Sequence, residues 1–480
     1  MARLFLPVSL AAIFCITGGC VPDTGGVDPP NDQLIFPVAL ATTRDATHLL
    51  VVNSNYDLRY NSGTLLMLSL AALDGAGDTT ADDKRIIFDE ASGVFTVPDA
   101  LSKFCTGDRK TDACTLDASR AALPEETIRL GAYASDLQMT ADQRWALIPV
   151  RGDRAIMVVE VDEHGDDKLY CGDQKSACDA AHRVRSNSRV NLPIEPLSVA
   201  ALDYPIPASP DAASDAPKTI ETFGFATHLA GGEVSLFSIA TTEPGQEPVI
   251  NAELISVIGG VIDGASGIAT NPLNRDIYVV GRRDPNPHVA VLRVLADLSS
   301  GGSYRNNPWF SQAATIPVAS QIYGGTEARS IAVSPKGDEA FFVTHQPPAL
   351  IKVNLETYET IDMTTVCPQP TRVKTWIDRG ASDDPDDDVL YAFVLCFLTQ
   401  QMHIVRTDVM MNTVRLTGQG PQDIAFDPVR KLAYVANFRD STITPYQAYP
   451  PFNQIRIKSA KDPEDVRWLQ FGSSQSAKEK

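Results

Sequence analysis

Residues 418–446 read GQGPQDIAFDPVRKLAYVANFRDSTITPY, and this stretch decides the fold. A proline opens a short apolar strand, a polar turn leads into the strongly apolar segment LAYVANF, and a polar loop precedes a third, β-branched strand. Short strands separated by turn residues predict an antiparallel meander. The middle strand is apolar on both faces, so the fold has to cover it from both sides.

The same pattern recurs along the chain. Two further clear copies are EARSIAVSPKGDEAFFVTHQPPALIKVN at residues 327–354 and GASGIATNPLNRDIYVVGRRDPNPHVAVLRV at residues 264–294. Weaker copies lie at residues 36–70, 135–162, 195–240 and 370–408. Copies of a β-meander that recur in this way are typical of a repeat architecture.

These copies predict an all-β fold, a seven-bladed β-propeller, because radial stacking lets each sheet cover the faces of its neighbours. We expect the propeller to span residues 33–460, with residues 33–36 pairing with the last blade as a closing strand. Residues 85–97 read RIIFDEASGVFTV and keep an eighth, degenerate blade open as an alternative. Long spacings between copies predict loop insertions at about residues 71–125, 163–190 and 205–217.

The copies resemble the YVTN-type β-propeller repeat. Its pattern of proline, apolar strand, Asp/Ser-Pro turn and Tyr-Val-Ala/Thr-Asn strand is met here by Pro421, by Asp427 with Pro428, and by residues 434–437. The SPKG turn at residues 334–337 matches in another copy. The resemblance covers nearly all of the chain after the N-terminal segment. It implies the fold and no single activity, because propellers host unrelated functions.

The N-terminal segment, MARLFLPVSLAAIFCITGGC, resembles a bacterial lipoprotein signal. Arg3 precedes an apolar run that is short for a membrane span, and small residues lead to Cys20. We therefore expect a lipoprotein signal peptide over residues 1–19 and lipidation of Cys20. Thr17 stands where such signals usually carry leucine, so a plain signal peptide and an uncleaved anchor remain alternatives.

The sequence after Cys20 fits a tether. Residues 20–32 are rich in Pro, Gly and Asp and offer little to bury. Val21 follows the cysteine where Asp would favour the inner membrane, so we expect an exported outer-membrane lipoprotein of the cell envelope that faces the periplasm or the cell surface. At the other end, residues 472–480 are expected to be a disordered tail.

Cysteine usage agrees with export. An even number of cysteines in local pairs predicts disulfide bonds in an exported protein. Proximity is the only basis for the pairing. No CxxC motif occurs and no histidine lies at ligand spacing from a cysteine pair, so we predict neither a metal site nor a cofactor. The predicted disulfide pairs are Cys105 with Cys114, Cys171 with Cys178, and Cys367 with Cys396.

The net charge of −19 disfavours polyanionic partners. Nucleic acids and anionic membrane surfaces bind basic footprints, so we expect no nucleic-acid partner. The expected partners are the membrane, reached through the lipid anchor, and proteins of the envelope. The propeller itself is expected to be a monomeric domain.

The propeller resemblance implies a candidate site. In such repeats the loops between second and third strands, and the segments that lead into first strands, share one face around the central channel. Arginines in these places predict a site for a carboxylate or phosphate group. The alternative is that each arginine pairs with a nearby acid, such as Arg151 with Asp153 or Arg439 with Asp440. The predicted ligand-binding residues are Arg59, Arg151, Arg154, Arg282, Arg283, Arg329, Arg372 and Arg439.

Two functions follow from these features. The first is a lipid-anchored, non-catalytic binding or assembly platform for an anionic ligand or an acidic partner, which fits the absence of catalytic motifs such as GxSxG or HExxH. The second is a hydrolase resembling the lactonase branch of seven-bladed propellers, acting on sugar lactones. Its catalytic candidates would be His228, His345, Glu327 and Arg329.

Overall fold

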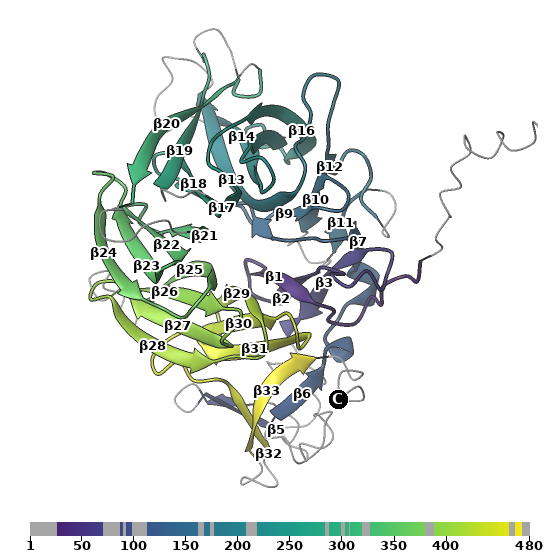
Figure 1. Cartoon of the computed structure of the whole chain (residues 1–480). Coiled ribbons are helices and arrows are strands. Elements are labelled where there is room, and N and C mark those ends of the chain that lie inside the picture. Colours follow the sequence, from purple (N-terminus) through teal and green to yellow (C-terminus); the bar gives the residue numbers. More distant parts are fainter. Residues whose placement is uncertain are drawn as a thin grey trace, which may run out of the picture.

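Strands dominate the computed structural model of the chain, and Figure 1 shows them fanned around a common axis. The helices among the described residues are the short 3₁₀ helices η4 (Ala118–Arg120) and η5 (Pro124–Glu126). In the described part of the chain, no helix combines the length and apolar character that a membrane crossing requires. The structure describes residues 26–70, 87–89, 93–97, 113–161, 168–172, 177–207, 218–283, 288–298, 303–306, 308–318, 327–379, 388–459 and 466–472.

Seven antiparallel sheets form the blades, and this confirms the all-β, seven-bladed prediction. Blade 1 consists of β1 (Pro37–Thr42), β2 (His48–Asn53), β3 (Gly63–Ser69) and β7 (Ile128–Gly131). Blade 2 consists of β8 (Gln138–Met139), β9 (Trp145–Val150), β10 (Ala155–Val161) and β11 (Leu169–Tyr170). Blade 3 consists of β13 (Pro196–Pro207), β14 (Lys218–His228), β15 (Val234–Thr242) and β16 (Val249–Ile258). In blade 2 the short strand β12 (Arg183–Val184) also pairs with β10.

The remaining blades repeat this order. Blade 4 consists of β17 (Ala265–Thr270), β18 (Ile277–Gly281), β19 (His288–Leu295) and β20 (Trp309–Pro317). Blade 5 consists of β21 (Ala328–Val333), β22 (Glu339–His345), β23 (Pro348–Asn354) and β24 (Thr360–Thr365). Blade 6 consists of β25 (Pro370–Asp378), β26 (Val389–Cys396), β27 (Gln401–Arg406) and β28 (Met411–Leu416). Blade 7 begins with β29 (Pro421–Asp427), β30 (Leu432–Asn437) and β31 (Thr442–Gln447).

The second strand of each blade is buried on both faces, as its sequence predicts. In β2 every residue is buried, and side chains alternate between two interfaces. Leu49 and Val51 pack in a cluster shared with blade 7, whereas Leu50 and Val52 pack in a cluster shared with blade 2. This period-two alternation is what makes each sheet depend on both of its neighbours.

Blade 7 closes the ring in a way that the sequence analysis missed. Its outer strand is β33 (Val466–Gly472), so the sheet extends beyond the predicted boundary at residue 460. Residues 33–36, expected to supply the closing strand, form no strand and simply lead into β1. That prediction was wrong because the outer position is taken by the C-terminal strand.

The insertion after β3 reinforces this closure. Its strands β4 (Ile87–Asp89), β5 (Val94–Val97) and β6 (Ala113–Asp117) join the blade 7 sheet, where β5 runs parallel to β32 (Arg456–Ser459) and β6 runs parallel to β33. The segment at residues 85–97 is therefore an extension of blade 7 and not an eighth blade. A loop of the first blade thus binds the outer edge of the last (Figure 1).

The other insertions are smaller than predicted. The segment at 163–190 contributes β11 and β12 to blade 2. The segment at 205–217 begins as a strand, because β13 and β14 form a long hairpin that still pairs Pro207 with Lys218. The residues between these two lie outside the described part of the chain.

Disulfide bonds join Cys171 to Cys178 and Cys367 to Cys396, as predicted. Cys114 is also disulfide-bonded, and its predicted partner Cys105 lies outside the described residues, as do Cys20, the predicted signal and residues 473–480 of the predicted tail. Gly472, the first residue of that predicted tail, belongs to β33. Part of the predicted tether is held against blade 1, since Arg129 forms an ion pair of 2.7 Å with Asp28.

Candidate functional site

Strand order explains why the predicted arginines share one end of the propeller. First and second strands run in opposite directions, so a segment that leads into a first strand lies beside the loop that follows the second strand. Ala328 at the start of β21, for example, pairs with Thr344 near the end of β22. We call this end of the seven blades the mouth face. All eight arginines belong to segments at this end.

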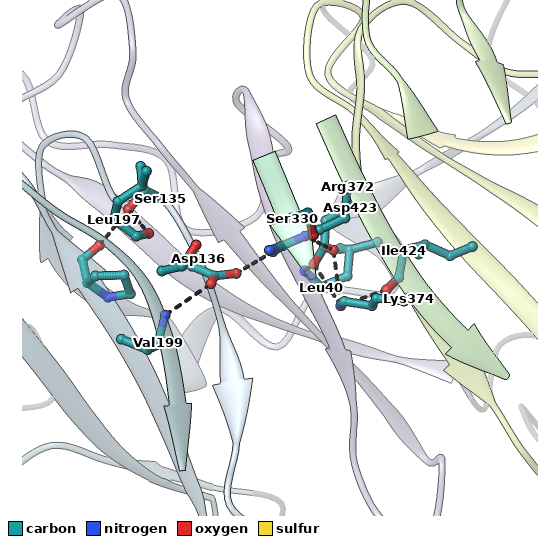
Figure 2. Close-up of polar contacts among 12 residues, drawn as sticks. Leu40, Ser135, Asp136, Leu197, Val199, Ser330, Arg372, Lys374, Asp423 and Ile424 are labelled. Carbon is teal, nitrogen blue, oxygen red and sulfur yellow. Dashed lines mark hydrogen bonds and ion pairs between the residues drawn. The ribbon is translucent and has the colours of Figure 1, made fainter. Parts of the chain in front are cut away.

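Arg372 differs from the other seven because it lies in the central channel. From β25 of blade 6 it forms an ion pair with Asp136, which precedes β8 of blade 2, and a second one of 2.9 Å with Asp423 on β29 of blade 7. Blades 7 and 1 separate blades 6 and 2 on the shorter way around the ring. The pair with Asp136 therefore crosses the channel, as Figure 2 shows.

The two carboxylates that hold Arg372 also bind neighbouring backbones. The Val199 amide of blade 3 donates to Asp136 Oδ2 at 3.2 Å, and the Leu40 amide of blade 1 donates to Asp423 Oδ2 at 2.9 Å. Lys374 Nζ donates to Asp423 Oδ2 at 3.1 Å. We call Arg372, Lys374, Asp136 and Asp423 the channel network; it connects the inner strands of five blades.

Charge pairing in the channel network is strong enough to reverse the effect of burial. Burial alone would lower the pKa of Arg372, but the Asp136 and Asp423 carboxylates outweigh it and raise that pKa. Burial would raise the pKa of Asp423, yet Arg372 and Lys374 hold it below its usual value. Both groups are thus charged and satisfied at neutral pH, which indicates a structural role.

A cavity of about 350 Å³ occupies the channel. Asp136, Arg372 and Lys374 lie in its wall together with uncharged residues of the inner strands such as Gln138 and Thr270. None of the four lactonase candidates lines this cavity. The cavity therefore belongs with the channel network and not with the predicted catalytic set.

A second group of charges lies on the mouth face of blades 2 to 5. Arg329 Nη2 donates to Glu327 Oε2 at 2.9 Å and lies 3.3 Å from His345 Nδ1. Across the mouth face, Arg151 of blade 2 forms an ion pair of 2.9 Å with Glu195, which leads into blade 3. The Nε atoms of Arg151 and Arg329 are both buried without a hydrogen-bond partner.

Arg282 stands among these charges without a partner of its own. It is partly buried, and no hydrogen bond or ion pair joins its guanidinium to any other residue in the described part of the chain. Burial, followed by repulsion from Arg329, lowers its pKa to about 10. The Glu327 carboxylate opposes this shift, and Arg151 and Arg283 add to it. We call Arg151, Arg282, Arg329, Glu327 and His345 the mouth cluster.

The other predicted arginines have separate contacts. Arg59 pairs with Asp57 at 3.3 Å, Arg154 Nε donates to the Leu192 carbonyl at 2.6 Å, and Arg283 donates to the Ala230 carbonyl at 3.4 Å. Arg439 lies over the Phe397 ring at 4.8 Å. The alternative pairs proposed from the sequence do not form, since Arg151 binds Glu195 and the Asp440 carboxylate accepts from the Gln419 amide.

The four lactonase candidates do not form one group. His345, Glu327 and Arg329 meet in blade 5, with His345 Nδ1 lying 3.4 Å from Glu327 Oε2. Burial and the Arg329 charge lower the pKa of His345 to about 4, so this ring is neutral at pH 7. His228 is completely buried in blade 3, where its ring nitrogens contact the Ile194 carbonyl at 3.2 Å and the Ser235 hydroxyl at 2.7 Å.

One potential metal-ligand group appears among the described residues. Cys367, Cys396 and His403 place their ligand atoms within 4.8 Å of one another. The two sulfur atoms are joined in a disulfide, whereas a metal ion binds thiolates. The residues therefore fit a structural disulfide better than a metal centre. His403 was not predicted to lie near this cysteine pair.

The acids of the channel network were also missed. Asp423 lies two residues after Pro421 in the first strand of blade 7, which is largely buried, and Asp136 precedes a first strand in blade 2. A carboxylate inside a strand that must be buried needs a buried partner. That signal could have separated Arg372 from the other arginines.

Comparisons with known proteins add the following. No protein-family profile and no curated protein matches the chain. Among solved structures, hydrazine synthase from Kuenenia stuttgartiensis is similar over 88% of this chain and 98% of that chain, at 11% identity and a TM-score of 0.49. A putative 6-phosphogluconolactonase from Bacteroides uniformis is similar over 92% and 86%, at 13% identity and a TM-score of 0.36. A putative 6-phosphogluconolactonase from Bacteroides fragilis is similar over 90% and 86%, at 11% identity and a TM-score of 0.37.

Proposed function

We propose that the protein is a lipid-anchored, non-catalytic binding platform of the bacterial cell envelope, and that the mouth cluster binds an anionic group of a ligand or of an acidic partner. The observation that carries this proposal is Arg282. Its partly buried guanidinium lies near Arg329 and Arg151 without a bonded carboxylate among the described residues.

The chemistry of the mouth cluster favours an oxyanion. A guanidinium offers paired N–H donors that match a carboxylate or a phosphate, and partial burial strengthens such a bond. A bound anion would relieve the repulsion between Arg282 and Arg329 and would raise the lowered pKa of Arg282.

Anion binding can be tested with citrate as the probe. Isothermal titration of the purified protein should show a single saturable site, and Arg282→Gln should weaken citrate binding about ten-fold or more, which corresponds to ~1.4 kcal/mol. Arg406→Gln is the matched control, because Arg406 is an exposed arginine paired with Asp408 in the turn between β27 and β28, away from the mouth face. Equal citrate affinity in wild type and Arg282→Gln would contradict the proposal.

A lactonase remains the second candidate because His345, Glu327 and Arg329 are in contact. His228 does not take part, since both of its ring nitrogens are bonded inside blade 3. Hydrolysis of glucono-δ-lactone that is lost in His345→Gln and kept in His228→Gln would favour this candidate. Absence of hydrolysis in the wild type, together with citrate binding, supports the platform.

The anchor is proposed on the sequence alone. If Cys20 is acylated, Cys20→Ser should move the protein from the membrane fraction to the soluble fraction, whereas Cys15→Ser should leave it on the membrane. Separation of inner from outer membranes by density tests the proposed outer-membrane location. Unchanged fractionation of Cys20→Ser would remove the anchor from the proposal.

A further inference from the structure

The mouth face of blades 6, 7, 1 and 2 carries a row of aromatic rings, which meets the mouth cluster at Arg151. Phe397 of blade 6 lies 6.0 Å from Phe438 of blade 7, which lies 5.4 Å from Tyr56 of blade 1. Tyr56 in turn lies 6.2 Å from Tyr133, which leads into blade 2. Phe36 packs beneath this row at 5.1 Å from Phe438. We call these five residues the aromatic arc.

Tyr56 is the exposed ring of this arc, and the other four rings are partly buried. Tyr56 is 60% exposed, and Leu58 in the same loop is 54% exposed. Contiguous exposed apolar side chains on a soluble domain mark an interaction surface. Rings from four successive blades reach the arc from the mouth face, and among them Phe438 also packs against the core cluster between blades 1 and 2.

An arginine stands at each end of the arc. At the blade 6 end, Arg439 lies over Phe397 and has no carboxylate partner among the described residues. At the blade 2 end, the Arg151 amide donates to the Tyr133 carbonyl at 3.2 Å, and the Arg151 guanidinium pairs with Glu195 through Nη2 while its Nε atom is buried without a hydrogen bond. Aromatic side chains bounded by arginines have the composition of protein-binding hot spots.

We infer that the aromatic arc docks an extended acidic segment of a partner protein, which lays apolar side chains on the rings and places carboxylates near Arg439 and Arg151. This inference extends the platform proposal by naming the chemistry of a partner, and it uses a different part of the mouth face from Arg282. The ring spacings match an extended segment of roughly five or six residues at about 3.3 Å per residue.

The ring geometry favours a peptide over a carbohydrate. Tyr56 meets Phe438 at an interplanar angle of 77° and Tyr133 at 86°, both edge to face, and Phe397 is tilted by 51° from Phe438, so neighbouring rings are not coplanar. Successive sugar rings stack on flat, coplanar aromatic faces, whereas apolar side chains fit the angled pockets between tilted rings. The terminal arginines add a charge complementarity that a neutral oligosaccharide lacks.

The test uses an array of synthetic heptapeptides that carry Asp at both ends and every combination of Phe, Leu and Ser between them. Fluorescence polarisation should find members that bind the purified protein, and the same peptides with Lys at both ends should not bind. Tyr56→Ala and Arg439→Gln should each weaken the best peptide at least five-fold. Trp309→Ala is the matched control, because Trp309 is 70% exposed on the outer strand of blade 4, away from the arc.

Failure of this inference is distinguishable from failure of the anion site. If citrate binds through Arg282 but no peptide binds, or if Tyr56→Ala leaves peptide affinity unchanged, the docking inference is overturned and the anion site stands. If the best peptide depends on Tyr56 while citrate does not bind, the docking inference stands and the anion site falls. Binding of cellohexaose through Tyr56, without binding of any peptide, would also overturn it.

Discussion

Arg372 and Arg282 lie at the same end of the propeller but in opposite electrostatic surroundings. Arg372 reaches across the channel to Asp136 and also binds Asp423, and its pKa is raised by these carboxylates against the effect of burial. Arg282 has no bonded partner among the described residues, and burial with repulsion from Arg329 lowers its pKa to about 10. One arginine is neutralised inside the fold and the other is not.

This difference distinguishes the structural role of Arg372 from the binding role that we propose for Arg282. A buried charge that the fold neutralises holds elements together, and removal of one partner leaves the other uncompensated. A half-buried charge among like charges is left for something outside the fold. Both residues are arginines at the mouth end of the repeat, Arg372 inside a first strand and Arg282 just after a second strand, and their partners distinguish the two roles.

The largest expected effect is on the stability of the propeller. Arg372→Met should lower the free energy of unfolding by about 3–5 kcal/mol, because Asp136 would lose its paired cation and Asp423 would keep only Lys374. Arg282→Met should change it by less than about 0.5 kcal/mol. Guanidinium unfolding followed by tryptophan fluorescence measures both, and similar losses in the two variants would contradict the distinction.

The next effect is a loss of stability in mild acid. His228 is held neutral, because burial lowers its pKa from 6.5 to about 4. Between these pH values the unfolded chain binds more protons than the folded one, so stability falls as the pH falls from 6.5 to 4 and is fully present above 6.5. The shift corresponds to about 3 kcal/mol.

Substitution of single histidines shows which of them causes the loss of stability in acid. His345 shifts in the same direction, so wild type should lose stability through both histidines as the pH falls. His228→Leu should flatten the slope of unfolding free energy against pH between 4 and 6.5, and His345→Gln should flatten it separately. A slope that is identical in wild type and His228→Leu would show that this histidine is not held neutral.

The smallest expected effect is a gain in the free energy of unfolding. Arg282→Glu should raise the free energy of unfolding by about 0.5 kcal/mol, because it removes repulsion and places a carboxylate near Arg329. It should also abolish citrate binding. Thermal unfolding at low and high salt measures the gain, which should shrink as salt increases. A decrease in stability would indicate that Arg282 is already satisfied.

The sequence predicted the propeller because the information for it is local. Strands such as HLLVVN and LAYVAN are apolar at every position that faces a neighbouring sheet, and a repeated strand of this kind can be covered only by further copies. The closure of blade 7 could not be predicted in the same way. The pairing of β6 with β33 joins segments some 350 residues apart, as in the bond from Gln470 to Thr115, and no local pattern specifies that register.

The candidate site was predicted in part for a similar reason. Loop positions in the repeat place the arginines at one end, but the identity of their partners depends on which blades face each other across the axis. Arg372 therefore looked equivalent to Arg282, and the aromatic arc, whose rings come from four blades, was not predicted at all. Contacts across the ring become visible only after the ring is closed.

The most direct test of the account is a crystal structure of the protein grown with selenate, a tetrahedral oxyanion whose selenium scatters anomalously. The account predicts an anomalous peak within hydrogen-bond distance of the Arg282 guanidinium, and none at Arg372, whose donors are already bound by Asp136 and Asp423. Selenate bound at Arg372 with both carboxylates displaced, or an Arg282 guanidinium bound by a carboxylate of the chain itself, would contradict it.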